Sequence, residues 1–468
     1  MKINLKLKII ILLPFIVFIC HFLGCAGNNE SSDVVKVTYW EKWTGFEGDA
    51  MQAVVDLFNS KKITNKEGKV IKVDMAITSQ LDRRLLTATA GGNPPDVAGA
   101  WTWLVTVYAD KGALLSLDSY LKEAGITKDN YLPIFWEICK YKGKMWCLPS
   151  TPASVALHWN KRLFREAGLD PNVPPKTIQE LDLMAEKLTK IKLPGEKKTI
   201  SLYELKKRDN YQELLNAGKI VQMGFLPSEP GWWPWFWGYW FGGELWNKKD
   251  TITADDPGNV NAYEWVQSYS LKYGVDNVKK FSSSFGQFSS PQNAFLSSKV
   301  AMVVQGTWMY NFINKYATGM SWAAAPFPSD EGKLKDVSYI EADILIIPKG
   351  ARHPDEAFKF MAFVNSQEGM ELLCKGQRKF TPLKKVSEDF YKKHKNPYIH
   401  MFRKLAESPN AFITPKMVIW QEYQREMSFA YETIRDLETL PQEALEQVTA
   451  SMQRRLNREE AMSRRIER

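Results

Sequence analysis

Aromatic side chains crowd one short segment of this chain. The chain has 17 tryptophans, and the crowded segment contains Trp232, Trp233, Trp235, Trp237, Trp240 and Trp246. Pro230, Pro234 and neighbouring glycines interrupt it, which argues against one continuous buried helix. Flat rings can cover the apolar C–H face of a polar ring compound such as a sugar. We therefore expect one or two of Trp232, Trp233 and Trp235 to line a ligand cleft, and the other rings to pack in a core.

Further residues suited to polar ligands follow expected strands or begin expected helices. Carboxylate, amide and guanidinium groups can hydrogen-bond the hydroxyl edge of a ligand whose faces stack on indole rings. The candidates outside the tryptophan cluster are Trp43, Thr44, Glu47, Gln80, Trp101, Trp308, Glu341, Asp343 and Arg378. The alternative for Glu341, Asp343 and Arg378 is a structural salt bridge between lobes. The alternative for each tryptophan is core packing.

Motifs for catalysis are absent from the sequence. It contains no G-x-S-x-G elbow, no GxxxxGK[ST] phosphate loop, no H-E-x-x-H and no G-x-G-x-x-G. No cysteine and histidine cluster has metal-ligand spacing, so we expect no metal, no cofactor and no enzyme activity. Glu341 and Asp343 could serve a glycoside hydrolase, which needs two carboxyl groups flanking the scissile bond. Since such pairs arise by chance among 53 acids, a secreted hydrolase is the second hypothesis.

The elements that position these residues alternate between strands and helices. Alternating apolar residues predict strands from Val35 to Tyr39 and from Val73 to Ile77. Helical spacing predicts helices carrying Met51 to Phe58 and Leu81 to Leu86, and a short strand follows at Asp96 to Ala98. This order is typical of a doubly wound parallel sheet, in which ligands bind beyond the carboxyl ends of the strands. The loops after these strands should therefore meet at one edge of the sheet.

Five collinear segments span most of the chain and carry a family resemblance. They are VTYWEKWTGFEGDAMQAVVDLFN, LLTATAGGNPPDV, GKMWCLPSTPASVALHWNKRLFREAGLD, AFLSSKVAMVVQGTW and ILIIPKGARHPDEAFKFMAFV. Together they resemble the family-1 extracellular solute-binding proteins, the carbohydrate group that includes maltose-binding protein. The resemblance implies an α/β, two-lobed periplasmic-binding-protein-like fold of type II. Each lobe would be a mostly parallel sheet flanked by helices, with a helical C-terminus and a ligand cleft between the lobes.

The resemblance also implies where the chain crosses between the lobes. The crossings would lie near residues 155–157, 298–301 and 344–347. Lobe 1 would comprise residues 34–154 plus 300–344, and lobe 2 would comprise residues 155–299 plus 345–468. The strand at Ile340–Asp343 departs from the family, which usually has glycines there. Its two carboxylates could accept hydrogen bonds from sugar hydroxyls or meet a cationic ligand.

The function implied by the resemblance is capture of a mono- or oligosaccharide for an ABC importer. The ligand would lie between the lobes, held by aromatic stacking and polar hydrogen bonds, and the lobes would close around it. The expected partners are the small-molecule ligand and the permease subunits of the importer, and we expect the protein to be a monomer. A sugar sensor or adhesin without a role in transport is a third hypothesis.

The amino terminus is typical of an exported lipoprotein. Lysines precede the apolar stretch from Ile9 to Phe22, which is short for a bilayer span and is interrupted by a proline and a histidine. Residues 1–24 are therefore predicted to be a signal peptide. The Phe22-Leu23-Gly24-Cys25 end resembles a lipobox, so Cys25 would be lipidated and residues 25–33 would form a tether. Cleavage without lipidation is the alternative, and either reading places the protein outside the cytoplasm.

Charge and cysteine content add two further expectations. The formal net charge of +9 is scattered and no nucleic-acid motif occurs, so we expect no nucleic-acid partner. Cys139 and Cys147 lie symmetrically about Gly143, where a hairpin turn could bring them opposite each other. In an oxidising compartment they could form a disulfide, and two half-buried thiols are the equal alternative. Cys374 is left over, with no role assigned.

Overall fold

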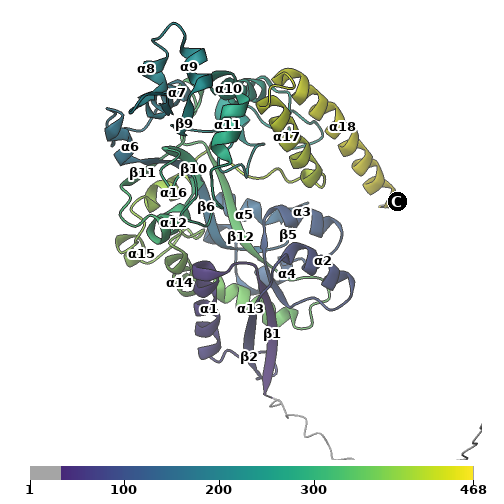
Figure 1. The fold of residues 1–468 in the computed structure, drawn as a ribbon. Coiled ribbons are helices and arrows are strands. Elements are labelled where there is room, and N and C mark those ends of the chain that lie inside the picture. Colours follow the sequence, from purple (N-terminus) through teal and green to yellow (C-terminus); the bar gives the residue numbers. More distant parts are fainter. Residues whose placement is uncertain (1–32, 467–468) are drawn as a thin grey trace, which may run out of the picture.

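The computed structural model describes residues 33–466, which form two lobes on one curled mixed sheet (Figure 1). The strand order is β10-β6-β12-β3-β1-β2, with β11 added to β6 and β13 added to β12. These strands are β1 (Val34–Glu41), β2 (Val70–Ile77), β3 (Val97–Trp101), β6 (Leu148–Asn160), β10 (Met302–Gly306), β11 (Trp322–Ala325), β12 (Ser338–Ile346) and β13 (Ala411–Phe412). Two small sheets complete the set, with strands β4 (Lys140–Tyr141), β5 (Lys144–Met145), β7 (Lys190–Lys192), β8 (Thr199–Ser201) and β9 (Lys219–Gln222).

Helices surround the sheet in both lobes. Those of the first lobe are α1 (Gly45–Ser60), α2 (Leu81–Ala90), α3 (Trp103–Asp110), α4 (Asp118–Ala124), η1 (Lys128–Asn130), α5 (Pro133–Ile138), α13 (Pro354–Val364), α14 (Gln367–Gln377), α15 (Glu388–Lys392) and α16 (Ile399–Ala406). Those of the second lobe are α6 (Lys161–Glu166), α7 (Ile178–Leu188), α8 (Leu202–Leu205), α9 (Tyr211–Ala217), η2 (Trp237–Phe241), α10 (Pro257–Tyr273), α11 (Val275–Ser282), α12 (Met309–Tyr316), η3 (Asp330–Gly332), α17 (Trp420–Arg435) and α18 (Pro441–Ile466).

The first lobe has the parallel strands that the sequence predicts. β1 pairs in parallel with β2 along its whole length, and β3 pairs in parallel with the end of β1. Helix α1 buries Met51, Val54, Val55 and Phe58, which follow one another at helical spacing on one face. Each such side chain stabilises the fold by roughly 1.5–3 kcal/mol when fully buried. The carboxyl ends of β1 and β3 therefore lie at one edge, as expected.

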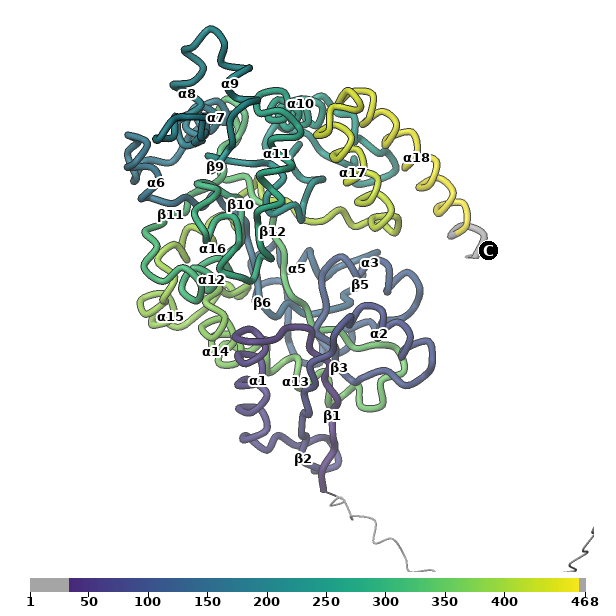
Figure 2. Tube along the Cα trace, viewed as in Figure 1, coloured from purple at the N-terminus to yellow at the C-terminus, as the bar shows by residue number. Residues whose placement is uncertain are grey.

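Two long strands, β6 and β12, run through both lobes (Figure 2). β6 has 13 residues, all buried. From Leu148 to Ser154 it pairs with β12, and from Val155 to Asn160 it pairs with β10 and β11. Because β6 belongs to both halves of the sheet, it connects the two lobes directly, without an intervening loop.

Strand direction in the second lobe differs from the prediction. The expected mostly parallel sheet holds for β1, β2 and β3, but β10 and β11 pair with β6 antiparallel, and in the first lobe β12 pairs antiparallel with both β3 and β6. The apolar period predicts that a segment is a strand and which face it buries, but it carries no information on the direction of its neighbours. The fold class is unaffected by this correction.

The predicted lobe boundaries also need correction. Residues Val300, Ala301, Met302 and Val304 pack in the core of the second lobe, not the first. The buried side chains from Ile344 to Ala406 pack in the core of the first lobe, where α14 lies against α1 (Figure 1).

Within residues 33–466 the chain thus crosses three times between the lobes: within β6, at the start of β12, and in the segment 407–416 after α16. The expected crossing near residues 155–157 agrees with this packing, and the other two do not. The period of apolar residues predicts that a segment is a helix with one buried face. It does not predict against which lobe that face packs, because either core can receive an apolar helix face.

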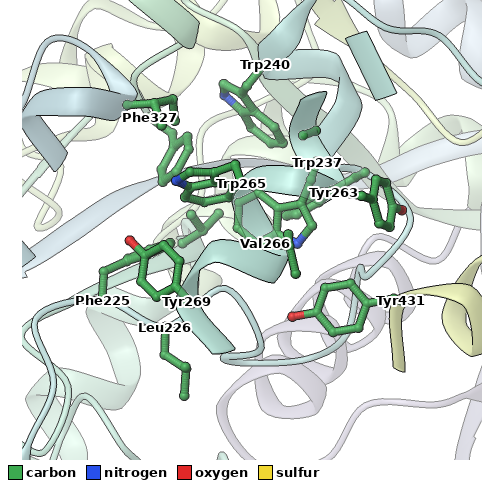
Figure 3. Packing of buried hydrophobic residues seen from close by; sticks show 14 of the residues in the cluster. Phe225, Leu226, Trp237, Trp240, Tyr263, Trp265, Val266, Tyr269, Phe327 and Tyr431 are labelled. Atoms are coloured by element: carbon green, nitrogen blue, oxygen red, sulfur yellow. The ribbon is translucent and has the colours of Figure 1, made fainter. Parts of the chain in front are cut away.

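Much of the tryptophan-rich segment belongs to the core of the second lobe (Figure 3). Trp237 and Trp240 are 2% and 0% exposed and pack against Phe327 at ring distances of 5.8 and 5.4 Å. Trp265 and Phe225 extend the same cluster. These rings fill the core, as expected for the members of the cluster other than Trp232, Trp233 and Trp235.

The C-terminal region is helical, as predicted, and consists of α17 and α18. Helix α18 buries Leu445, Val448 and Met452 against the second lobe and then extends past the body of the protein (Figure 2). Within residues 33–466, no helix combines the length and the apolar character needed to cross a bilayer. The predicted signal peptide, the tether up to Ser32 and Cys25 lie outside the described residues.

The three cysteines within residues 33–466 are buried and unbonded. The predicted hairpin is present as β4 and β5, and the amide of Trp146 donates to the carbonyl of Cys139 across it. Cys139 and Cys147 are free thiols, as is Cys374. Burial, followed by the neighbouring Cys139, raises the pKa of the Cys147 thiol well above its ordinary value. Of the two alternatives that the sequence left open, the structure contains the thiols.

Candidate functional site

A cavity of about 770 Å³ lies between the two lobes. The first lobe contributes the loop after β1, the end of β3 and the middle of β12. The second lobe contributes the segment around Trp232 to Trp235 and the start of α12. The lining side chains used below are Trp43, Glu47, Trp101, Trp103, Thr151, Trp232, Trp233, Trp235, Trp308, Lys315, Tyr339, Glu341, Asp343 and Lys379.

The floor of the cavity is a buried charge network centred on Asp343. Lys42 Nζ lies 2.9 Å from its Oδ1, and Lys379 Nζ lies 3.4 Å from its Oδ2. The hydroxyl of Thr151 donates to Oδ2 at 2.8 Å. Lys379 also reaches Glu47 Oε1 at 3.0 Å. Both oxygens of Asp343 are therefore engaged, and the two lysine side chains, each 3% exposed, hold the network in place.

Burial alone would raise the pKa of Asp343, but the two lysines outweigh it. They hold the pKa of this carboxyl well below its usual range. Burial likewise opposes the charge on Lys379, and Glu47 and Asp343 together raise its pKa above the ordinary value. Asp343 and Lys379 are therefore both charged across the physiological pH range, and each compensates the charge of the other.

Glu341 lies two residues before Asp343, on the same face of β12, and has a different environment. Burial, and secondarily the negative charge of Asp343, raise its pKa from 4.5 to about 7. Lys42 and Lys379 lower it only in part. Among the described residues, no hydrogen bond or ion pair to its carboxyl occurs within contact distance. The pKa of Glu341 is therefore raised and that of Asp343 is lowered, because the lysines bind only Asp343.

Aromatic rings form the first-lobe wall beside this floor. Trp43 and Trp101 meet edge to face, with ring centroids 6.0 Å apart. The ammonium of Lys42 lies 5.2 and 5.3 Å from the centroids of these two rings. Such cation–π contacts orient the rings and add to the stability of a buried ammonium. Trp103 stacks on Trp101 at 6.1 Å, so the wall presents ring faces and edges to the cavity.

Three tryptophans form the facing wall of the second lobe. Trp308 lies 6.2 Å from Trp232 and 6.1 Å from Trp233, measured between ring centroids. Its Nε1 donates to Gln305 Oε1 at 3.0 Å. Trp232 is 39% exposed, which is high for so large an apolar side chain. Gly306, directly before Thr307, lies beneath the Trp308 ring, because a Cβ there would stand 2.4 Å from the ring atoms.

Most of the predicted site residues come together at this cavity. Those that line it are Trp43, Thr44, Glu47, Trp101, Trp232, Trp233, Trp235, Trp308, Glu341 and Asp343. Trp235 lies beneath the surface of the cavity wall. It is only 2% exposed, and its ring centroid lies 4.9 Å from that of Trp420. Asp343 is paired with Lys42 and Lys379, which both belong to the first lobe, so its ion pairs lie within one lobe and not between the lobes.

Gln80 and Arg378, which were also expected at the site, do not line the cavity. Gln80 is an exposed residue in the left-handed conformation before α2. Arg378 ends α14 in the left-handed conformation, and its guanidinium donates to the carbonyls of Lys375 and Gly376. A guanidinium at a helix C-terminus finds ready acceptors in the last unpaired carbonyls, and this turns Arg378 away from the site. The next residue, Lys379, points inward in its place.

Sequence reasoning missed the lysines of the floor. Lys42 lies in the loop after β1 that was expected to face the site, so its position was a usable signal. No sequence signal marked Lys379, because it follows α14, a helix that the predicted boundaries place in the second lobe. Thr151 and Tyr339 were missed for a similar reason, since each lines the cavity only through the tertiary arrangement, whereas Trp103 follows the predicted strand at Asp96 to Ala98, where a loop facing the site is expected.

A second cavity, of about 940 Å³, lies on the other side of the segment 409–416 and shares only Thr414 with the first. Trp246 is its single tryptophan, and none of the predicted site residues lines it. Lys416 reaches across this region and donates to the carbonyls of Glu137 in α5 and Lys140 in β4. Although this cavity is larger, the converging rings and charges mark the first cavity as the candidate site.

Comparison with known proteins supports this fold. The family model described as bacterial extracellular solute-binding protein matches residues 46–371. The maltotriose-binding protein of Pyrococcus abyssi is 22% identical over 341 residues, covering 72% of this chain and 64% of that protein. The sn-glycerol-3-phosphate-binding periplasmic protein UgpB of Escherichia coli (strain K12) is 28% identical over 172 residues, 36% of this chain and 38% of that protein.

Among solved structures, one described as CpMnBP1 with mannotriose bound has a TM-score of 0.73 and 28% sequence identity. The similarity covers 89% of this chain and 99% of that one. The predicted two-lobed α/β fold class is confirmed by this similarity.

Proposed function

This chain belongs to the bacterial extracellular solute-binding protein family, and we propose that it is the receptor of an ABC importer that captures a sugar or short oligosaccharide between its lobes. The relatives named for maltotriose and the structure with mannotriose support a carbohydrate ligand. The permease subunits of the importer would be its protein partners. Capture without chemical change is the proposed activity.

One observation carries this proposal: tryptophans from both lobes face each other across a cavity with a charged, hydrogen-bonding floor. Trp43 and Trp101 belong to one wall, and Trp232, Trp233 and Trp308 belong to the other. Rings on two sides can sandwich the apolar faces of a sugar, while carboxylates and lysines below bind its hydroxyls. A cavity of several hundred cubic ångströms is of the size that buries a small ligand.

In the proposed mechanism, ligand binds to one lobe first and the other lobe then closes over it. The ligand stabilises the closed form by its greater affinity for that form, because both walls contact it only there. The shared strands β6 and β12 would act as the hinge. The closed receptor would be the form that the permease recognises.

Calorimetric titration with mannobiose, mannotriose and maltotriose tests the proposal. We expect at least one to bind, with quenching or shift of tryptophan fluorescence and a loss of affinity of roughly 10-fold or more in Trp233→Ala and Trp308→Ala. The control is Trp246→Ala, because Trp246 lines the other cavity. Binding of an amino acid, polyamine or peptide in place of any sugar would contradict the carbohydrate assignment and leave the receptor assignment intact.

We also propose that the receptor is exported and held at the membrane by lipid on Cys25. The apolar segment before Cys25 and the polar residues after it support this proposal. Expression of the full-length chain and a Cys25→Ser variant in a bacterial host tests it. We expect the unchanged chain in the membrane fraction and the variant in the soluble exported fraction. Equal membrane association of both would contradict lipidation.

The hydrolase hypothesis gains no support from the site. Both oxygens of Asp343 are bound by Lys42, Lys379 and Thr151, so this carboxylate is not free to attack a sugar or activate a water. Glu341 and Asp343 also project from one strand, whereas a glycosidase places its carboxyls on opposite sides of the bond. Incubation with the oligosaccharide that binds should release no reducing ends.

A further inference from the structure

Glu341 is the carboxyl of the cavity that the protein itself leaves without a partner. Glu47 is paired with Lys379, and Asp343 is paired with Lys42 and Lys379. Within residues 33–466, neither a hydrogen-bond donor nor a cation lies within bonding distance of the Glu341 carboxyl. Glu341 is half-buried and lines the cavity, so hydroxyl groups of a ligand can reach its carboxyl and supply the hydrogen bonds that the protein does not.

The charges around Glu341 define what that partner can be. Glu41, Glu47 and Asp343 outnumber the two buried ammonium groups, Lys42 and Lys379, and each of these lysines is already within 4 Å of acids.

Four segments of the described chain face the Glu341 carboxyl. β12 contributes Tyr339 and Asp343, the loop after β1 and α1 contribute Lys42 and Glu47, and the end of α14 contributes Lys379. On α12, across the cavity, Lys315 lies exposed at the rim. The interior therefore holds an excess of negative charge and no unpaired cation to receive an acidic ligand.

We propose that Glu341 is the specificity-determining residue of this site: its free carboxylate accepts hydrogen bonds from hydroxyl groups of an uncharged oligosaccharide and excludes ligands that carry phosphate or carboxylate groups. This inference rests on the proposed function. Hydroxyl groups of sugars supply the donors that Glu341 lacks, and charge-assisted hydrogen bonds of this kind are stronger than neutral ones. A phosphate beside Glu341 and Asp343 would meet like charge in a desolvated cavity.

Ligand binding should then be linked to protonation of Glu341. In the free protein, burial and Asp343 place the pKa of this carboxyl at about 7. Hydroxyl donors stabilise the ionised form, so the bound state has the lower pKa and binding releases a proton. Affinity therefore rises with pH, by up to about tenfold between pH 6 and pH 8.

Calorimetry of the whole exported chain with mannotriose and with sn-glycerol 3-phosphate, at pH 6 and pH 8, tests the inference. For the unchanged protein we expect affinity for mannotriose to rise between these pH values, and sn-glycerol 3-phosphate to bind at least about 100-fold more weakly than mannotriose. Glu341→Gln should bind mannotriose roughly 10- to 100-fold more weakly, with no dependence on pH and a smaller preference over the phosphate. The change removes a buried charge, so this variant is expected to fold.

Glu229→Gln is the matched control, because burial also raises the pKa of Glu229 to about 7 and this residue does not line the cavity. It should bind mannotriose with the affinity and pH dependence of the unchanged protein. Equal binding of mannotriose by the unchanged protein and Glu341→Gln at both pH values would overturn this inference alone. Failure of both mannotriose and maltotriose to bind would overturn the proposed function together with this inference.

Discussion

Glu341 and Asp343 illustrate how neighbours set the chemistry of a side chain. They lie two residues apart on β12 and face the same cavity, yet the pKa of one is raised and that of the other is lowered. The difference follows from contacts within a few ångströms: Lys42, Lys379 and Thr151 all bind Asp343. A buried carboxylate with donors is a structural anchor, and one without donors is available to a ligand.

The unpaired carboxyl should make the stability of the free protein depend on pH. The pKa of Glu341 is about 7 in the folded chain against 4.5 as its ordinary value, so the folded state binds more protons between these values and loses stability as pH rises. Glu341→Gln should therefore unfold with a free energy higher by up to about 3 kcal/mol at pH 8, with little difference at pH 4. Urea denaturation at both pH values measures this. A difference that does not change with pH would contradict it.

The opposite result is expected for a lysine of the charge network. Lys379→Met would leave Glu47 and Asp343 with one lysine between them, so the free energy of unfolding should fall by about 3–5 kcal/mol at pH 7. Lys375→Met is the control, since Lys375 pairs with Glu371 from the same helix but is 44% exposed, and its loss should cost less than about 1 kcal/mol. Similar losses in the two variants would mean that the network is not needed for folding.

At the scale of an element, the end of β10 shows how a strand and a glycine place a ring. The chain turns after Gly306, and the Trp308 ring folds back over that glycine, where a Cβ would lie 2.4 Å from it. The side-chain oxygen of Gln305 accepts a hydrogen bond from the indole nitrogen of the same ring. One short stretch of chain thereby supplies the strand end, the space and the hydrogen bond that orient one ring of the cavity wall.

A methyl group at Gly306 should displace this ring. We expect Gly306→Ala to weaken binding of mannotriose about as much as Trp308→Ala, while the secondary structure seen by circular dichroism stays unchanged. The double variant should be no weaker than Trp308→Ala, because the two changes act on one contact. Calorimetric affinities of the three variants measure this, and full affinity in Gly306→Ala would show that the ring can move aside without consequence.

At the scale of the whole molecule, the two lobes are joined by elements that belong to both. β6 pairs with β12 in its first half and with β10 and β11 in its second half, and the segment 409–416 separates two cavities. Motion of one lobe against the other therefore changes both cavities together. If these shared strands act as the proposed hinge, we expect closure to leave both hydrophobic cores intact.

Ligand should stabilise the entire chain and draw the lobes together. At a free mannotriose concentration 100 times the dissociation constant, the free energy of unfolding should rise by about 2.7 kcal/mol. Small-angle scattering should show a smaller radius of gyration under the same conditions. Trp308→Ala at the same sugar concentration serves as the control and should show smaller changes. An increase in stability without any contraction would contradict closure and leave binding intact.

The sequence by itself determined the alternation of strands and helices in the first lobe, the helical C-terminus and the residue types at the strand ends. These features depend on local period and on the rule that loops at the carboxyl ends of parallel strands meet, so Trp43, Glu47 and Trp101 could be placed in the site. The tryptophan cluster and the two carboxyls of β12 were recognisable for the same reason, by residue type and position.

Only the tertiary structure decided which groups pair. It assigned α13 to α16 to the first lobe, made the second-lobe strands antiparallel, turned Arg378 outward and brought Lys42 and Lys379 to Asp343. These outcomes depend on contacts between segments hundreds of residues apart, whose free energies are set by burial and by charges only a few ångströms away. No local pattern carries that information, and the lack of a partner for Glu341 is a property of the assembled cavity alone.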